Sequence, residues 1–341
     1  MIETRLRTSV SIIIVRILLK YVEKKGIESF EICKTAEIDS SILKNSQARV
    51  SAKQFRAVWE AAVAKAGDVN FGLNFGKEMA QNFPGGHILY NVMMNCPTVR
   101  DAAEKFIHYN GLMADAVQPR LAQEGNFIYL TISNSNFKYK IPRHISEALL
   151  SSYVNIFRHI TEDNFNLVEV RFKHKMPEDT AQHEIFFRSP LLFEQPANEL
   201  VIAKECLELP IFLANPGLLK PLEQIAQKFI DHLYLSDNLS DKVIRLLSNL
   251  LTKGERTNIE TIAASLAMSV RSMQIKLKEE RTSYQKLLDS VRKEIALSYL
   301  QEEDVTICDI AFLLGFSEQS AFNHAFKRWT GGSPKRFFKS K

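Results

Sequence analysis

The stretches IETIAASLAMSVRSMQIKLK (residues 259–278) and ICDIAFLLGFSEQSAFNHAFKRW (residues 307–329) decide the fold of the C-terminal third of this chain. The second stretch repeats the apolar positions of the first 48 residues later. The matching positions are Ile262, Ala263 and Leu266 in the first stretch and Ile310, Ala311 and Leu314 in the second. Each set is spaced for one face of a helix, and its small alanine lets a second helix cross closely. Each stretch therefore predicts a helix-turn-helix motif.

Helix-start residues support both motifs. Ser269 and Ser317 are the expected N-caps of the two recognition helices, because a Ser oxygen can accept a bond from a free N–H of the first turn. Three capping boxes are expected, at Thr257-x-x-Glu260, Thr282-x-x-Gln285 and, in an Asp variant, Thr306-x-x-Asp309. Between the motifs, residues 283–300 predict a helix of about 18 residues, or ~27 Å. Such a rod can hold both recognition helices roughly one DNA turn apart, in major grooves on one face of a duplex.

The excess positive charge of the chain lies in the same third. From Asp241 to Lys341 there are 17 Lys and Arg against 12 Asp and Glu, whereas the first 240 residues hold 27 of each kind. This division fits a polyanionic partner for the C-terminal third alone. The alternative is an ordinary helical bundle with solvated surface charges. The internal repeat, the charge division and the polar outer faces together favour DNA binding.

The preceding part of the chain predicts a mixed α and β domain. Helices are expected at residues 11–24, 51–66, 87–94, 98–108 and 145–160, and strands at residues 117–122, 127–133, 167–173, 183–187 and 200–203. The first two strands are expected to form a hairpin through Glu124-Gly125-Asn126. Asn215-Pro216-Gly217 marks a break, after which residues 218–235 predict a connecting helix that ends at Ser236-Asp237-Asn238.

Composition excludes several classes of protein. A chain of 341 residues, 45% hydrophobic and 24% charged, is typical of two folded domains. Cys33, Cys96, Cys206 and Cys308 lie far apart without a CxxC pair, as in reduced thiols of a cytoplasmic protein. The histidines are equally scattered, so no metal is expected. No Gly-rich phosphate loop or Ser-His-Asp set points to a cofactor or a catalytic residue. No apolar run approaches the ~20 residues of a membrane span, and Arg16 interrupts the apolar run that a signal peptide needs.

Residues 259–338 closely resemble the DNA-binding domain of AraC-type transcription regulators. The most specific motifs are LGFSEQSAF (residues 314–322), FKRWTG (residues 326–331) and the Ser-Pro that follows. Upstream, FPGGHILYNVMMNCPTVRDAAEKFIHYN (residues 83–110) and FFRSPLLFEQPANELVIAKECLELP (residues 186–210) resemble the arabinose-binding-type sensor domain of one branch of this family. The resemblance implies regulation of transcription at promoter DNA, contact with RNA polymerase, and a first domain that binds a small effector and forms a homodimer.

The residues expected to contact DNA lie on the polar faces of the two recognition helices. Base contacts are expected from Arg271, Gln274, Ile275, Gln319, Ser320, Asn323 and His324. Phosphate contacts are expected from Ser269, Lys276, Lys278, Ser317, Lys327 and Arg328. Arg can pair with guanine and Gln with adenine, each contributing ~1–3 kcal/mol of discrimination. The family usually has Arg where Ile275 and His324 stand and Gly where Arg281 stands, so the reading surface departs from the family pattern.

The expected fold class is α+β: a mixed α/β N-terminal sensor domain followed by an all-α domain of two tandem helix-turn-helix motifs joined by a long helix. The expected boundaries are residues 1–212 for ligand sensing and dimerisation, 213–239 for the connecting helix and linker, and 240–341 for DNA binding. The function predicted is a cytoplasmic, sequence-specific transcription regulator, activator or repressor, without enzymatic activity. Two alternatives stay open: an enzyme with a DNA-binding appendage, such as an alkyl-transfer repair protein, and a constitutive regulator whose first domain only dimerises. The effector itself is not identified by the sequence.

Overall fold

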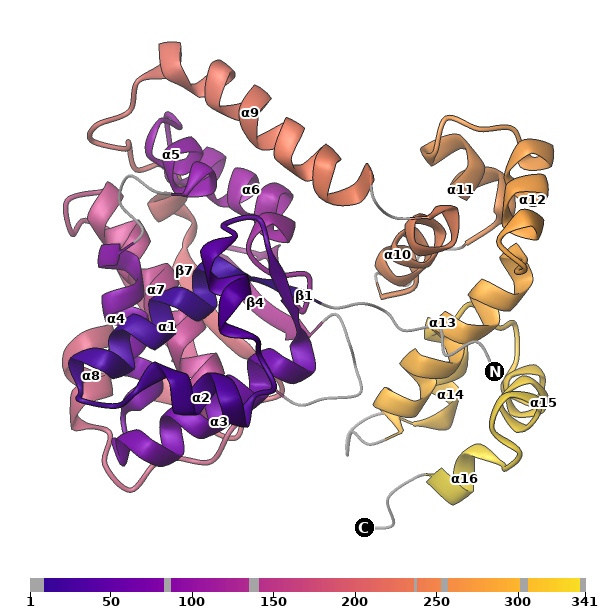
Figure 1. Cartoon of the computed structure of the whole chain (residues 1–341), viewed down its shortest axis with the longest axis horizontal. Helices are drawn as coiled ribbons and strands as arrows, with labels where there is room; N and C mark the ends of the chain where they lie inside the picture. The colour runs from indigo at the N-terminus through magenta and orange to yellow at the C-terminus, as the bar shows by residue number, and fades with distance from the viewer. Residues whose placement is uncertain are drawn as a thin grey trace. The chain divides into compact units, whose positions relative to one another are not determined.

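The computed structural model describes residues 9–82, 87–134, 141–235, 238–252, 257–300 and 306–337. They form two compact units, each with its own hydrophobic core (Figure 1). The first unit runs to Asp231 and the second begins at His232. Positions 83–86, 236–237 and 338, which the sequence motifs include, lie outside the described residues. Within the described ranges, no helix has the length and apolar character needed to cross a membrane.

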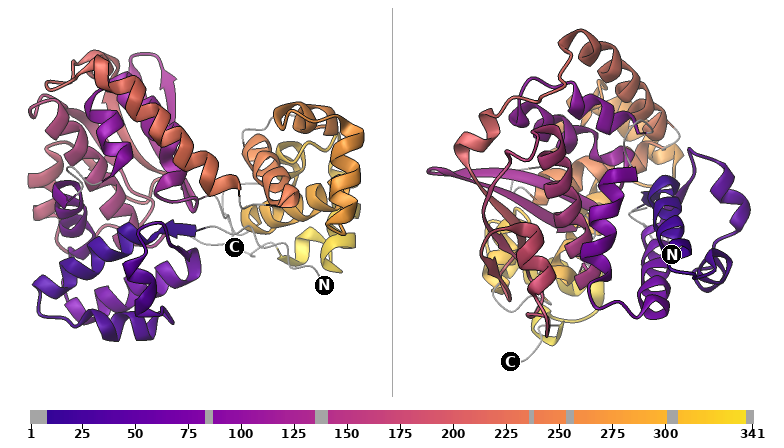
Figure 2. Two further views of the ribbon diagram at one scale, coloured as in Figure 1. Left: turned by 45° about the horizontal axis from the view of Figure 1, so that its top comes forward. Right: turned by 90° about the vertical axis from the view of Figure 1, so that its left-hand side faces the viewer.

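The first unit contains a five-stranded sheet in the order β3-β4-β7-β5-β6. Its strands are β3 (Val117–Glu124), β4 (Phe127–Asn134), β5 (Leu167–Arg171), β6 (Leu191–Leu192) and β7 (Asn198–Ala203). Among these described strands, β5 and β6 pair in parallel and the other neighbours pair antiparallel. The predicted hairpin is confirmed as β3–β4, which projects from the sheet with Gly125 in a left-handed turn conformation (Figure 2). A separate antiparallel pair joins β1 (Ser9–Ser11) to β2 (Arg49–Ser51).

Helices supply the rest of the first unit. They are α1 (Ile12–Lys24), α2 (Ser29–Thr35), α3 (Ala52–Ala66), α4 (Phe71–Asn82), α5 (Ile88–Met94), α6 (Val99–Tyr109), α7 (Arg143–Ile160), α8 (Ala181–Phe187) and α9 (Pro216–Leu235). Short 3-10 turns occupy Ser40–Lys44, Asn110–Leu112 and Lys204–Glu208. The expected helices are confirmed to within two residues at each end, and Ser51 starts α3 with a full capping box to Gln54. The strands β1, β2 and β6 and the helices α2 and α4 were not expected.

Two glycines let α4 approach α7 closely. A Cβ added at Gly72 would lie 2.2 Å from the carbonyl oxygen of His144, and one at Gly76 would lie 1.9 Å from Oγ of Ser151. These distances are far below van der Waals contact, so only glycine fits at either position. The four-residue spacing places both glycines on the face of α4 that packs on α7, as their contacts show.

The expected strand at residues 183–187 is wrong, because the structure has helix α8 there. His183 and Phe187 are both fully buried, four residues apart, which is the helical period. Arg158 of α7 stabilises this short helix by donating hydrogen bonds to the carbonyl oxygens of Phe186 and Phe187 at its C-terminal end. Phe186 and Phe187 therefore belong to a helix and not to a strand. The C-terminal end of that helix is stabilised by Arg158, which is distant in sequence.

Helix α9 packs one face on the core of the first unit. Ala226 is fully buried there, and Leu219, Leu222 and Ile230 are partly buried against the same core. The expected linker, residues 213–239, therefore contains α9. The part of α9 up to Asp231 belongs to the first unit. Lys105 of α6 forms an ion pair with Glu223 of α9, in which Nζ lies 2.5 Å from Oε1.

The second unit is helical among its described residues. Its helices are α10 (Leu239–Thr252), α11 (Ile259–Ser265), α12 (Val270–Glu279), α13 (Tyr284–Tyr299), α14 (Ile307–Leu313), α15 (Gln319–Thr330) and α16 (Pro334–Phe337). The two predicted motifs are confirmed as α11–α12 and α14–α15, and α13 is the predicted helix between them (Figure 1). All six repeat positions except Leu266 are almost fully buried.

The helix starts in this unit match only part of the expectation. Thr306 and Asp309 form the predicted capping box of α14, and Ser269 caps α12 by accepting from Ser272 N at 3.1 Å. The box expected at Thr257 is wrong, because Asn258 is the N-cap of α11 and accepts from Thr261 N at 2.7 Å. Asn caps at least as well as Thr and stands one residue nearer the helix.

Two further caps are displaced by one residue. At the start of α13, Ser283 rather than Thr282 accepts from the backbone N–H of Lys286, at 3.3 Å. At the start of α15, the N-cap is Glu318 and makes no side-chain cap bond, so the prediction of a Ser317 cap is wrong. Glu318 adopts an extended backbone conformation, with φ −153° and ψ 152°, which starts the helix one residue later than the repeat predicts.

Candidate nucleic-acid interface

Helix α12 presents its predicted reading residues on the outside. Met273 and Leu277 are fully buried and fix the inner face of the helix. The exposed residues on α12 include Arg271, Gln274 and Ile275, which were the predicted base contacts. Ile275 is 52% exposed. An apolar side chain exposed on this helix is suited to contact a thymine methyl group in the major groove.

Helix α15 presents a similar face with one difference. Phe322 and Phe326 are fully buried, and Gln319, Ser320 and His324 are exposed. Asn323 differs from the expectation because it is half-buried, and its Oδ1 is shielded from solvent without a hydrogen-bond partner among the described residues. A shielded and unsatisfied amide oxygen is costly unless a partner arrives.

The predicted phosphate contacts are all exposed. Within the described part of the chain, Lys276, Lys278 and Lys327 form no ion pair, so their charges are available to a polyanion. Arg328 is different, because its Nη2 lies 3.0 Å from Oδ2 of Asp289 on α13. A phosphate must compete with Asp289 for Arg328, although an exposed pair of this kind is weak.

The sequence reasoning missed two residues that position the reading helices. Glu280, at the end of α12, accepts hydrogen bonds from the backbone N–H groups of Leu239 at 2.7 Å and Ser240 at 2.8 Å. Its carboxylate thereby satisfies the free N–H groups at the start of α10 and interacts favourably with the helix dipole. The cap is 40 residues distant from the helix it caps, so no local sequence pattern could reveal it.

Arg292 is the second missed residue. Its guanidinium stacks on the ring of Phe316 at 4.6 Å and so holds the turn of the second motif against α13. Burial lowers the pKa of Arg292, and the negative charge of Asp289 opposes that shift. Gly315 and Phe316 form the turn of the second motif, and their partner Arg292 lies on another helix, beyond the reach of a local sequence pattern.

The comparison with known families agrees with this geometry. Residues 26–211 match the family model described as the arabinose-binding domain of AraC transcription regulators, N-terminal. Residues 262–340 match a helix-turn-helix domain model. The chain belongs to the AraC-type transcription regulators. This confirms the predicted fold class and the absence of an enzymatic role, because the family consists of DNA-binding regulators.

Individual relatives of this AraC-type regulator include proteins from two organisms. The ornithine utilization regulator of Pseudomonas aeruginosa is 28% identical over 320 residues, which cover 94% of this chain and 93% of the relative. The transcriptional regulator VirS of Mycobacterium tuberculosis is 35% identical over 130 residues, 38% of this chain and 37% of VirS. Among solved structures, the regulator CdpR of Pseudomonas aeruginosa is 20% identical, with a TM-score of 0.42 over 91% of this chain and 96% of CdpR.

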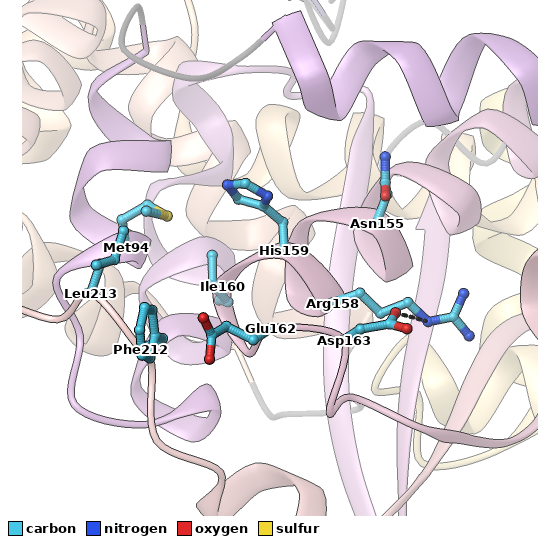
Figure 3. A pocket seen from close by; sticks show the side chains of 9 residues that line it. All are labelled: Met94, Asn155, Arg158, His159, Ile160, Glu162, Asp163, Phe212 and Leu213. Carbon is cyan, nitrogen blue, oxygen red and sulfur yellow. Dashed lines mark ion pairs between the residues drawn. The ribbon is translucent and has the colours of Figure 1, made fainter.

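The first unit contains a pocket of about 480 Å³. It lies where the C-terminal end of α7 meets the loop that precedes α9 (Figure 3). Its lining residues are Met94, Asn155, Arg158, His159, Ile160, Glu162, Asp163, Phe212 and Leu213. The volume is in the range of small-molecule sites. Among the described residues, no group of three or more His, Cys, Asp and Glu side chains could hold a metal ion.

Proposed function

We propose that this AraC-type regulator reads a bipartite promoter site with α12 and α15. Base contacts are assigned to Arg271, Gln274, Ile275, Gln319, Ser320, Asn323 and His324, and phosphate contacts to Ser269, Lys276, Lys278, Ser317, Lys327 and Arg328. The observation that carries the proposal is the matched exposure of polar side chains on two helices whose opposite faces are buried in one core. The half-buried Asn323 reads a base only if its amide oxygen gains a donor there, and exocyclic amino groups in the major groove are such donors.

The experiment starts from an unbiased search for the operator. The full chain is used to select duplexes from a random library, and the selected duplex is mapped for two protected half-sites. Two half-sites about one helical turn apart, on one face of the DNA, support reading by both helices. A single protected half-site contradicts the assignment of base contacts to one of them.

We further propose that a small effector bound in the first unit controls DNA binding, and that the regulator acts as a cytoplasmic homodimer that contacts RNA polymerase. The pocket of the first unit and the match of residues 26–211 to the arabinose-binding domain support effector binding. The relative named for ornithine utilization supports a small metabolite as the class of effector. Activation and repression are both compatible with this arrangement.

The competing arrangement is a constitutive regulator whose first unit only dimerises. The two are separated by measuring operator binding for residues 240–341 and for the full chain, each with and without a small-molecule extract of cells. The second unit has its own core, so the fragment is a suitable comparison. Under effector control, the extract changes the operator affinity of the full chain and leaves that of the fragment unchanged. If the extract changes the operator affinity of neither protein, effector control is contradicted.

A further inference from the structure

The pocket of the first unit combines an apolar wall with charged groups. In Figure 3, Met94, Leu213, Phe212 and Ile160 gather at one end, and Arg158 and Asp163 lie at the other. Phe212 and Leu213 are 63% and 66% exposed, although both are large apolar residues. Two adjacent exposed apolar side chains at the mouth of a pocket offer a surface that a ligand with an apolar body would cover.

The charged residues that line the pocket differ in whether a protein group pairs with them. Nε of Arg158 lies 3.9 Å from Oδ1 of Asp163, and Nη1 of Arg188 lies 2.5 Å from Oδ2 of the same residue. Asp163 is therefore neutralised by protein groups, and these interactions lower its pKa. Glu162 forms no ion pair within the described residues. Glu162 is therefore the lining carboxylate whose negative charge is left, among the described residues, for a ligand to pair with.

The position of Glu162 fixes where that charge acts. Its carboxylate lies beside Phe212 and Ile160, between the apolar wall and the Arg158–Asp163 pair (Figure 3). A carboxylate next to an aromatic ring is an arrangement that attracts an ammonium group from two sides, by charge and by the ring's quadrupole. His159 also lines the pocket and is drawn above Ile160 and Glu162, between the two ends (Figure 3).

The backbone that carries Glu162 is also unusual. Glu162 and Asp163 both adopt left-handed conformations, with φ of 49° and 65°. Such φ values are disfavoured for residues with a Cβ, and two in succession are rare. Asp163 N donates to the carbonyl oxygen of Arg158 at 2.7 Å, which ties this turn to the end of α7. The turn thus places the unpaired carboxylate at the pocket rather than continuing the helix.

We propose that this pocket binds a small organic amine: its protonated ammonium group pairs with Glu162, and its apolar body lies along Phe212, Leu213 and Met94. This inference rests on the proposed function, since it names the chemical class and the location of the effector. The loop that carries Phe212 and Leu213 leads directly into α9 at Pro216, and Phe212 N donates to Ile160 O at 3.1 Å. A bound amine therefore bridges α7 and the segment that continues toward the DNA-binding unit.

The test uses three six-carbon probes that differ only in their head group. Hexylamine, 1-hexanol and hexanoate are each titrated into the full-length protein, and binding is followed by ligand-observed NMR and calorimetry. We expect hexylamine to bind at least tenfold more tightly than the other two. Equal affinity for amine and alcohol, preference for hexanoate, or no binding of any probe would overturn the proposal.

Variants locate the amine. Glu162→Gln removes the charge and keeps the shape, and we expect it to weaken hexylamine binding at least tenfold. Glu178→Gln is the matched control, because Glu178 is also exposed and lies outside the pocket. Phe212→Ala alters an exposed side chain and is expected to weaken hexylamine binding as well. Unchanged affinity in Glu162→Gln, or an equal loss in Glu178→Gln, contradicts the assignment.

Operator binding is measured on the same protein samples. A protein that binds its operator normally and binds no amine overturns this inference and leaves the promoter-binding proposal intact. If hexylamine binds through Glu162 but leaves the operator affinity unchanged, the amine site stands and effector control through it fails.

Discussion

Ala267 and Gly315 occupy the same position in the two motifs, and both have left-handed backbone conformations, with φ of 52° and 75°. Each follows a helix that ends in the same pair of backbone bonds. Met268 N and Phe316 N reach back five residues, to Ala263 O and Ala311 O. This is the Schellman ending, which glycine fits best. The first motif therefore has a strained side chain where the second has none.

The strain at Ala267 can be measured. A left-handed non-glycine residue costs roughly 1–2 kcal/mol, and part of that is offset by the greater unfolded-state freedom of glycine, about 0.4–1 kcal/mol. We expect Ala267→Gly to raise the free energy of unfolding of the second unit by up to about 1 kcal/mol. Gly315→Ala should lower it by a similar amount. Urea unfolding of residues 240–341 checks both, and a loss of stability in Ala267→Gly contradicts this explanation.

Arg281 repeats this situation at the end of α12. Its φ is 60°, and Thr282 N donates to Leu277 O at 2.9 Å, five residues back. Arg281 therefore places an exposed cation at a left-handed turn position, where a residue with a Cβ is strained. The sequence alone could not separate strain from a different turn, because only the backbone angle distinguishes the two.

Base-reading and phosphate-binding residues should respond differently to substitution. Arg271→Ala or Gln274→Ala is expected to cost ~1–3 kcal/mol at the selected operator and little on random duplex, because base contacts carry the sequence information. Affinities for both duplexes, measured at several salt concentrations, provide the check. Equal losses on the two duplexes would remove these residues from the reading surface.

Lys278 is assigned to a phosphate and gives the matched comparison. Lys278→Ala is expected to weaken binding to operator and random duplex alike and to reduce the slope of log K against log salt by about 1. Lys175→Ala, an exposed lysine of the first unit, is the control and should leave the slope unchanged. A slope that does not change in Lys278→Ala contradicts the phosphate assignment.

At the scale of elements, the periodic spacing of apolar residues predicted the helices whose formation depends on their own local sequence. The amphipathic helices α1, α3, α6 and α7 follow from apolar spacing and capping residues, and the tandem motif follows from its repeat. Helix α8 could not be predicted, because its Ile and Phe residues favour strands and its end is held by Arg158 from another helix. Helix α4 was missed because glycine lowers the local helix propensity. The two glycines of α4 instead allow its close packing on α7.

The close packing of α4 on α7 predicts a large effect of one methyl group. Gly76→Ala places a Cβ where Ser151 Oγ and the Ala148 carbonyl already lie. We expect a loss of ~1–3 kcal/mol from the free energy of unfolding of the first unit, as for overpacked cores. Gly76→Ala combined with Ser151→Ala should recover part of the loss, because one of the two colliding atoms is removed. Thermal unfolding of the first unit measures both, and an unchanged midpoint in the single variant contradicts the packing argument.

At the scale of the whole molecule, the two cores predict two unfolding transitions with different pH dependence. In the first unit, burial lowers the pKa of His87 to about 4. Glu147 is also fully buried: burial opposes its ionisation, but hydrogen bonds with His144, His183 and Arg143 dominate and hold its pKa well below the usual range. Both shifts are downward. The stability that they contribute is present above the unfolded-state pKa values and is lost as pH falls through the folded-state values.

Acidification should therefore destabilise the first unit. The loss is expected to begin near pH 6.5 through His87 and to continue below about pH 4.5 through Glu147. Calorimetry of the full chain between pH 7 and pH 4 should show one transition moving to lower temperature as His87 is drawn into the charged form. Glu147→Gln should be less stable than the parent at pH 7, with a smaller difference at low pH. A constant difference at every pH contradicts the role given to its charge.

The cap that Glu280 provides to α10 has a mechanical consequence. The chain enters the second unit at Leu239, and that entry is fastened through Glu280 to the C-terminal end of α12. Under the proposed function, a displacement of the chain at Leu239 would reach α12 directly through Glu280, whereas the turn before α15 is held separately by the contact of Arg292 on α13 with Phe316.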